Sequence, residues 1–109
     1  MNGEDLVFKL KADFIKALAH PLRLAIIEHL KTGERSVGQL ALYLEVNQSH
    51  ISKNLSVLKQ AGILKSHQEK STVYYAIKDD DIFKVLRGIA DILGKKLRES
   101  ERLLEHLAK

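Results

Sequence analysis

Two short helical patterns follow each other between residues 36 and 62, and only Glu45-Val46-Asn47 separates them. Ser36 with Gln39 matches a capping box at the start of the first pattern. Asn47 is a favourable N-cap for the second. Because the break is so short, the chain must turn sharply from one helix into the next. This arrangement predicts a helix-turn-helix.

The second helical pattern has one apolar and one polar face. Ile51, Leu55 and Leu58 recur at helical spacing, and we expect them to face the core. The other face carries amides, hydroxyls, an imidazole and lysines but no carboxylate, a composition that suits the base edges and phosphates of DNA. The residues predicted to contact bases are Gln48, Ser49, His50, Ser52, Lys53 and Asn54.

A β-hairpin is expected after these helices. Residues 64–68 and 72–77 are predicted to be strands, the second because it is rich in β-branched and aromatic residues. The intervening Glu69-Lys70-Ser71 lacks the Gly that many tight hairpin turns use, which leaves the turn type open. We expect this wing and the end of the preceding helix to meet the DNA backbone. The predicted backbone and wing contacts are Ser56, Lys59, Lys65, His67, Lys70 and Ser71.

The net charge of +4 is concentrated in the same part of the chain. Residues 47–78 hold five Lys and one Glu, whereas residues 1–46 hold six basic and six acidic residues and residues 79–109 hold seven of each. A local basic excess on an otherwise neutral chain indicates a surface for a polyanion. The alternative is a solvated face with chance lysines, which charge alone does not exclude.

Helices with long apolar stripes are predicted near both ends of the chain, over residues 5–18 and 81–107. The second would span about 40 Å, more than a domain of this size can cover. With Gly88 and Gly94 inside it, this helix favours packing against a second copy; the alternative is a kinked helix folded onto its own core. The predicted dimer interface consists of Leu6, Leu10, Phe14, Ile89, Leu93, Leu97 and Leu104. The expected fold is a dimeric winged helix-turn-helix, mainly α with a small β-hairpin wing, as one domain over residues 1–109.

Composition excludes several classes of protein. The chain has no Cys, and therefore no disulfide framework, thiol nucleophile or Cys metal site. No apolar run reaches the ~20 residues of a membrane span. The acidic start is unlike a signal peptide, so we expect a cytoplasmic protein. No nucleophile–base spacing or Gly-rich phosphate loop is present, so we expect no enzyme.

Three stretches of the chain combine into a more specific pattern. They are Ala19-His20-Pro21-x-Arg23, the run from Asn47 to Gly62, and Tyr74-Tyr75. Together they resemble the second helix, the recognition helix and the second wing strand of the ArsR/SmtB family of bacterial winged-helix repressors. The resemblance covers about residues 8 to 95. It implies a homodimer that is paired through its first and last helices. It also implies binding to a pseudo-palindromic operator, usually as a repressor released by a signal.

The sequence departs from that family at its familiar metal sites. Where metal-sensing members often carry a Cys pair, residues 39–44 contain none. Where another group uses an Asp-x-His pair and two later ligands, Asp79 is followed by Asp81, Ile92 and Lys95. Neither ligand set exists here, and we expect no cofactor.

The signal for such a regulator is left open. Glu101, Glu105 and His106 are weak candidates for a nickel or zinc site, although such residues on a polar helix face are usually just solvated. The alternatives are an apolar small molecule at the dimer interface, or no inducer. The predicted partners are double-stranded DNA, a second copy of the chain and an unknown inducer, but no membrane.

The sequence thus predicts a sequence-specific DNA-binding transcriptional regulator. The alternative from another class is a winged-helix protein-interaction module without a DNA role. Such a module would carry a more apolar or acidic outer face than residues 48–60 have.

Overall fold

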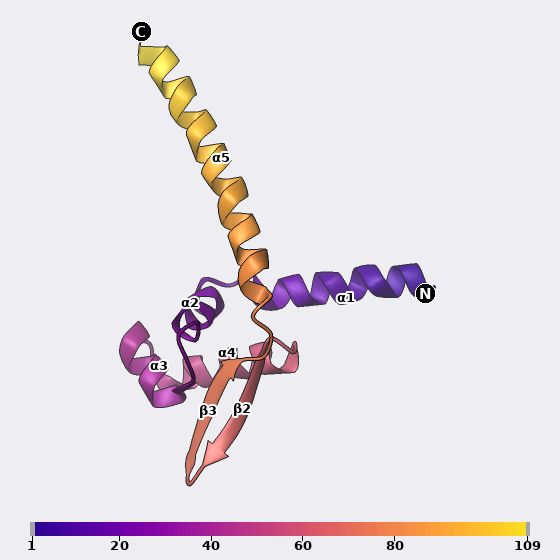
Figure 1. Cartoon of the computed structure of the whole chain (residues 1–109), viewed down its shortest axis with the longest axis vertical. Helices are drawn as coiled ribbons and strands as arrows, with labels where there is room; N and C mark the ends of the chain where they lie inside the picture. Colours follow the sequence, from indigo (N-terminus) through magenta and orange to yellow (C-terminus); the bar gives the residue numbers. More distant parts are fainter. Residues whose placement is uncertain (1, 109) are drawn as a thin grey trace. The chain divides into compact units, whose positions relative to one another are not determined.

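The computed structural model describes residues 2–108, which form five helices and a small sheet (Figure 1). In chain order the elements are α1 (Gly3–Leu18), α2 (Pro21–His29), β1 (Arg35–Ser36), α3 (Val37–Leu44), α4 (Gln48–Gln60), β2 (Leu64–Glu69), β3 (Thr72–Ile77) and α5 (Ile82–Ala108). The predicted class, mainly α with a hairpin wing after a helix-turn-helix, is confirmed. The chain forms two compact units: the first runs to Asp79, and the second begins at Asp80 and consists of α5. A single helix has no core of its own, so the second unit is not a second globular domain.

Side chains next to the helices determine where they begin. The Ser36 hydroxyl accepts a hydrogen bond from the Gln39 N–H at 3.2 Å, and Gln39 Oε1 accepts one from the Ser36 N–H at 2.9 Å. This confirms the capping box of α3. Asn47 Oδ1 accepts from the His50 N–H at 2.9 Å and caps α4 as predicted. At the start of α2, His20 is the N-cap.

The turn between α3 and α4 depends on one residue with left-handed backbone geometry. Glu45 ends α3 at φ 55° and ψ 44°, and the Val46 N–H then bonds the Ala41 carbonyl at 3.2 Å. A side chain in this region is strained by ~1–2 kcal/mol, so the packing of the helices on either side must hold it. The three residues between α3 and α4 therefore form a sharp, structured turn and not a flexible linker.

The core of the first unit lies between α2, α3, α4 and the sheet. The fully buried side chains are Ile26, Ile27, Leu40, Ile51, Leu55, Leu58 and Leu64. This confirms the predicted inner face of α4, where each apolar side chain contributes about 1.5–3 kcal/mol by leaving water. Tyr43 lies on α3 and is 58% exposed. Its ring stacks on that of His29, with the centroids 6.0 Å apart.

The sheet has three antiparallel strands in the order β1-β3-β2. The hairpin is paired from Leu64 opposite Ile77 to Glu69 opposite Thr72, so its turn is Lys70-Ser71. Lys70 has φ 56°, which is how this turn closes without a Gly. The first strand, Arg35–Ser36, was not predicted, because two residues are too few for any periodic pattern.

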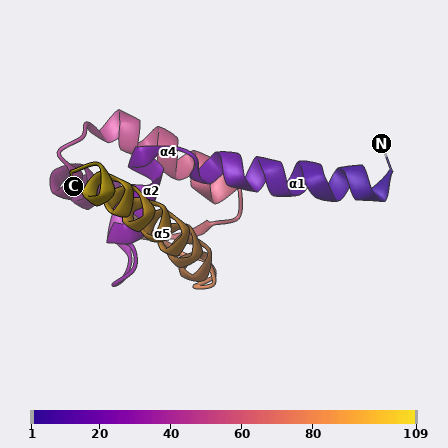
Figure 2. The same ribbon diagram turned by 90° about the horizontal axis from the view of Figure 1, so that it is seen from above.

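Most of α1 projects away from the other helices of its unit (Figures 1 and 2). Only Ala17 and Leu18 at its end are buried. Its exposed apolar side chains include Leu6, Leu10 and Phe14. Within residues 2–79, these apolar side chains stay exposed.

Among residues 2–108, no helix combines the length and the apolar character that crossing a membrane requires.

Candidate nucleic-acid interface

The start of α4 presents five of the six predicted base contacts to solvent. These exposed side chains are Gln48, Ser49, His50, Ser52 and Lys53. The first turn is held by Asn47, whose Oδ1 also accepts from the Ser49 hydroxyl at 3.1 Å. The backbone is thus fixed by its cap, and Asn47 Nδ2 also lies 3.5 Å from His50 Nδ1.

Asn54 is the sixth predicted base contact, and the structure places it elsewhere. It is only 8% exposed. Its Oδ1 accepts from Arg23 Nε at 2.9 Å, and its Nδ2 donates to the His50 carbonyl at 2.8 Å. Because both ends of the amide are engaged inside the protein, Asn54 is not available to a base. Its position was readable, because residue 54 is three after Ile51 and four before Leu58, on the inner side of the helix.

The predicted backbone contacts lie at the end of α4 and along the wing, which extends past α4 in Figure 1. Ser56, Lys65, Lys70 and Ser71 are exposed. Lys59 is exposed as well, but its Nζ donates to Ser66 Oγ at 2.7 Å. This hydrogen bond joins the end of α4 to the base of the wing, so Lys59 also has a structural role that its sequence position did not reveal.

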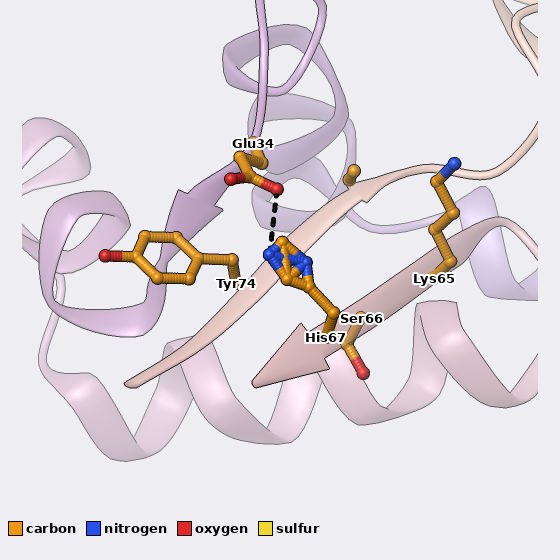
Figure 3. A pocket seen from close by; sticks show the side chains of 6 residues that line it. Glu34, Lys65, Ser66, His67 and Tyr74 are labelled. Atoms are coloured by element: carbon orange, nitrogen blue, oxygen red, sulfur yellow. Dashed lines mark ion pairs between the residues drawn. The ribbon is translucent and has the colours of Figure 1, made fainter. Parts of the chain in front are cut away.

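A hollow of about 290 Å³ opens beside the wing, and His67 lies in it (Figure 3). The imidazole is directed at the Glu34 carboxylate, with Nε2 3.4 Å from Oε2, and is 3.8 Å from Glu69 Oε1. Its ring centroid is 5.7 Å from that of Tyr74. His67 was predicted as a DNA contact, but its neighbours here are two carboxylates.

All seven predicted dimer residues are exposed. On α1 these are Leu6, Leu10 and Phe14, and on α5 they are Ile89, Leu93, Leu97 and Leu104. The polar side of α1 carries an ion pair in which Lys9 Nζ is 2.8 Å from Asp13 Oδ2. This hydrogen bond from Lys9 lowers the pKa of Asp13 below its usual value.

The weak metal candidates do not form a site within one chain. Over the part of the chain that the structure describes, no three histidine or acidic side chains are arranged to hold a metal ion. Glu101, Glu105 and His106 are exposed along α5.

Comparison with known proteins places this geometry in a family. Residues 20–66 match the model of the bacterial regulatory proteins of the arsR family. A transcriptional regulator of the helix-turn-helix type from Mycobacterium tuberculosis is 36% identical over 98% of this chain and 94% of its own length. A biofilm growth-associated repressor of Agrobacterium fabrum is 35% identical over 72% of this chain and 67% of its own length.

Solved structures agree with these sequence matches. The crystal structure of the mycobacterial regulator superposes with a TM-score of 0.77 at 35% identity, covering 85% of this chain and 94% of that one. A homodimeric winged helix-turn-helix DNA-binding domain from Mycobacterium bovis superposes with a TM-score of 0.76 at 31% identity, covering 84% and 87%. With the family model, the near full-length relative and the winged helix-turn-helix in agreement, the chain belongs to the arsR family of bacterial regulatory proteins and is a DNA-binding transcriptional regulator.

Proposed function

We propose that this regulator works as a homodimer on a pseudo-palindromic operator and represses the gene that it controls. The observation that carries the proposal is the exposed, carboxylate-free start of α4 beside a basic wing. A recognition helix of this kind enters the major groove, and two copies related by a twofold axis read two half-sites one helical turn apart.

Within each half-site we assign base reading to five side chains and backbone contacts to the wing. The proposed readers are Gln48, Ser49, His50, Ser52 and Lys53. Gln pairs bidentately with adenine, Ser bonds several base edges, and Lys suits guanine or phosphate. Lys65 and Lys70 would meet phosphates, which carry most of the affinity but no sequence information.

The exposed apolar stripes on α1 and α5 support the homodimer. Each stripe repeats over several helical turns, and its side chains are exposed in residues 2–108, which is unusual for a chain that acts alone. The mycobacterial domain named as homodimeric has the same fold. Repression is supported by the relative that is named a repressor.

The proposal also covers catalysis, cofactors, cellular location and the inducer. We assign the chain no catalytic role and no resident cofactor, and we place it in the cytoplasm, where a regulator of this family meets DNA. An inducer of unknown chemistry would act on the dimer. A metal inducer would need ligands from both copies, because one copy does not assemble a site in residues 2–108.

The test is binding to the DNA upstream of the protein's own gene, against a scrambled duplex of equal length. At ~150 mM salt nonspecific affinity is weak, so a specific regulator should prefer the native duplex by two orders of magnitude or more. Titrations with nickel and zinc added would report metal-dependent release. Transcription from that promoter, with and without the protein, separates repression from activation. Equal, weak binding to both duplexes would contradict the proposal and favour a protein-interaction module.

A further inference from the structure

Arg23 and Asn54 connect two helices that the proposed function treats separately. Arg23 belongs to α2, and Asn54 lies 31 residues further along the chain, in α4. Arg23 Nε donates to Asn54 Oδ1 at 2.9 Å. The same guanidinium donates through Nη1 to the carbonyls of Lys16 and Ala17, each at 3.3 Å. One side chain therefore holds the end of α1 and the middle of α4 together.

Each end of this connection is chemically favourable. Lys16 and Ala17 lie in the last turn of α1, where the helix dipole favours a cation, and the Lys16 carbonyl also accepts a hydrogen bond from the Ala19 N–H at 3.2 Å. At the other end, Asn54 Nδ2 donates a 2.8 Å hydrogen bond to the His50 carbonyl, which lies in the first turn of α4. His50 is one of the proposed base readers.

The Arg23 side chain lines two hollows next to α4. Arg23 lines a hollow with Lys16, Ala17 and Gln60, towards the end of α4. It lines a second hollow with His20, His50 and Lys53, towards the start of α4. Removing the Arg23 guanidinium would leave a gap between the end of α1 and α4. The buried Asn54 amide would then lose the hydrogen bond from Arg23.

We propose that Arg23 and Asn54 form a positioning link, which fixes the reading helix α4 relative to the end of α1. This inference rests on the proposed function and adds to it. Neither residue touches DNA through this link. They act by setting where Gln48 to Lys53 stand relative to α1 and, through α1, relative to the second copy.

The competing explanation is that Arg23 is simply a cation for a nearby phosphate. Lys keeps the charge but lacks the planar fork that donates to acceptors in two helices. A lost phosphate contact lowers the salt slope of binding by about 1, whereas a misplaced helix weakens binding with the slope kept. Arg23→Lys and Asn54→Ala therefore separate the two explanations.

The experiment measures operator affinity at several salt concentrations for Arg23→Lys, Asn54→Ala and the double variant. Each single variant should bind about tenfold more weakly with an unchanged salt slope, since each loses a hydrogen bond to a charged group. The double variant should bind no more weakly than the worse single one. Arg35→Lys is the matched control, because the guanidinium of Arg35 bonds its neighbours Glu34 and Thr32. The operator affinity of Arg35→Lys should stay within about twofold of the wild-type affinity.

Amide hydrogen exchange in α4, measured without DNA, tests the link separately from the proposed function, because it does not depend on operator binding. Both single variants should exchange faster over His50 to Asn54 while circular dichroism shows them folded at the same temperature. Wild-type affinity for Arg23→Lys, or wild-type exchange for Asn54→Ala, would overturn the link. The link would also be overturned if the double variant lost operator affinity by the product of the two single losses. If the wild type prefers no duplex, the proposed function fails, and exchange still decides on the link.

Discussion

The start of α4 and the length of α1 are both exposed, but their chemistry is opposite. On α4 the exposed side chains are amides, hydroxyls, an imidazole and a lysine, and every apolar residue expected inside is buried. On α1 the exposed side chains include large apolar ones, such as Leu10 at 60%. A polar face of this kind loses nothing in water and gains by meeting DNA, whereas an apolar face gains by leaving water. Under the proposed function both are binding surfaces, and composition indicates which partner each one takes.

The largest expected effect comes from placing a charge in the apolar stripe of α1. Leu10→Glu should dissociate the dimer, because a carboxylate would be buried against the second copy without a partner. Operator affinity should fall by about a hundredfold or more, since a monomer reaches one half-site only. Sedimentation velocity and operator titration measure the two effects.

Lys11→Glu is the control for that variant, because it reverses a charge on the same helix outside the predicted stripe. It should remain dimeric. A Leu10→Glu protein that still sediments as a dimer would show that α1 is not the pairing surface.

Changes on the polar face of α4 should alter which sequences are bound, not whether the protein dimerises. Gln48→Ala or Ser52→Ala should change the preference among operator variants by ~1–3 kcal/mol for a true base contact. Ser56→Ala removes a hydroxyl from the same helix and should leave the preference unchanged. Selection from a randomised duplex pool measures all three, and an unchanged preference after both of the first two would contradict the assignment of readers.

A smaller and more uniform effect is expected at the wing. Lys70→Ala should weaken binding to all sequences alike and lower the salt slope by about 1, because it removes one phosphate contact. Lys78→Ala, just past the other end of β3, is the matched control and should leave the slope as it is. A Lys70→Ala protein that changes its sequence preference would place this residue among the base readers instead.

The smallest effect is expected on the polar side of α1. The hydrogen bond from Lys9 lowers the pKa of Asp13 in the folded protein. Its contribution to stability is therefore present above the ordinary carboxyl pKa and is lost as the pH falls through the folded pKa. Asp13→Asn should lower the Tm by less than about 2 °C at pH 7, since the pair is exposed, and by nothing at pH 2. In a Lys9→Gln background, Asp13→Asn should change the Tm equally at pH 7 and at pH 2, as measured by thermal scans. If the change still depends on pH there, the Lys9–Asp13 pair is not the cause of the pH dependence.

The sequence was sufficient where one local rule decided the outcome. Capping side chains placed the starts of α3 and α4, and apolar spacing placed Ile51, Leu55 and Leu58 in the core.

The sequence was insufficient where the partner lies far along the chain. Asn54 was assigned to the outer face from its chemistry, although its spacing from Ile51 and Leu58 indicates the inner face, and only its hydrogen bond from Arg23 had no local signal. The hydrogen bond from Lys59 to Ser66 and the contact of His67 with Glu34 likewise form only after the sheet packs on the helices. The strand β1 was missed because its two residues become a strand only by pairing with β3.

Ser36 belongs to two elements at once, since it pairs with Tyr74 in the sheet and caps α3. The wing and the helix-turn-helix are therefore joined through a single residue, and the Lys59–Ser66 bond joins them a second time. Two such joints leave the hairpin little freedom to swing on its own. The ordering entropy of the wing is lost when the chain folds and not when it meets DNA, so we expect rigid-body docking with fast association.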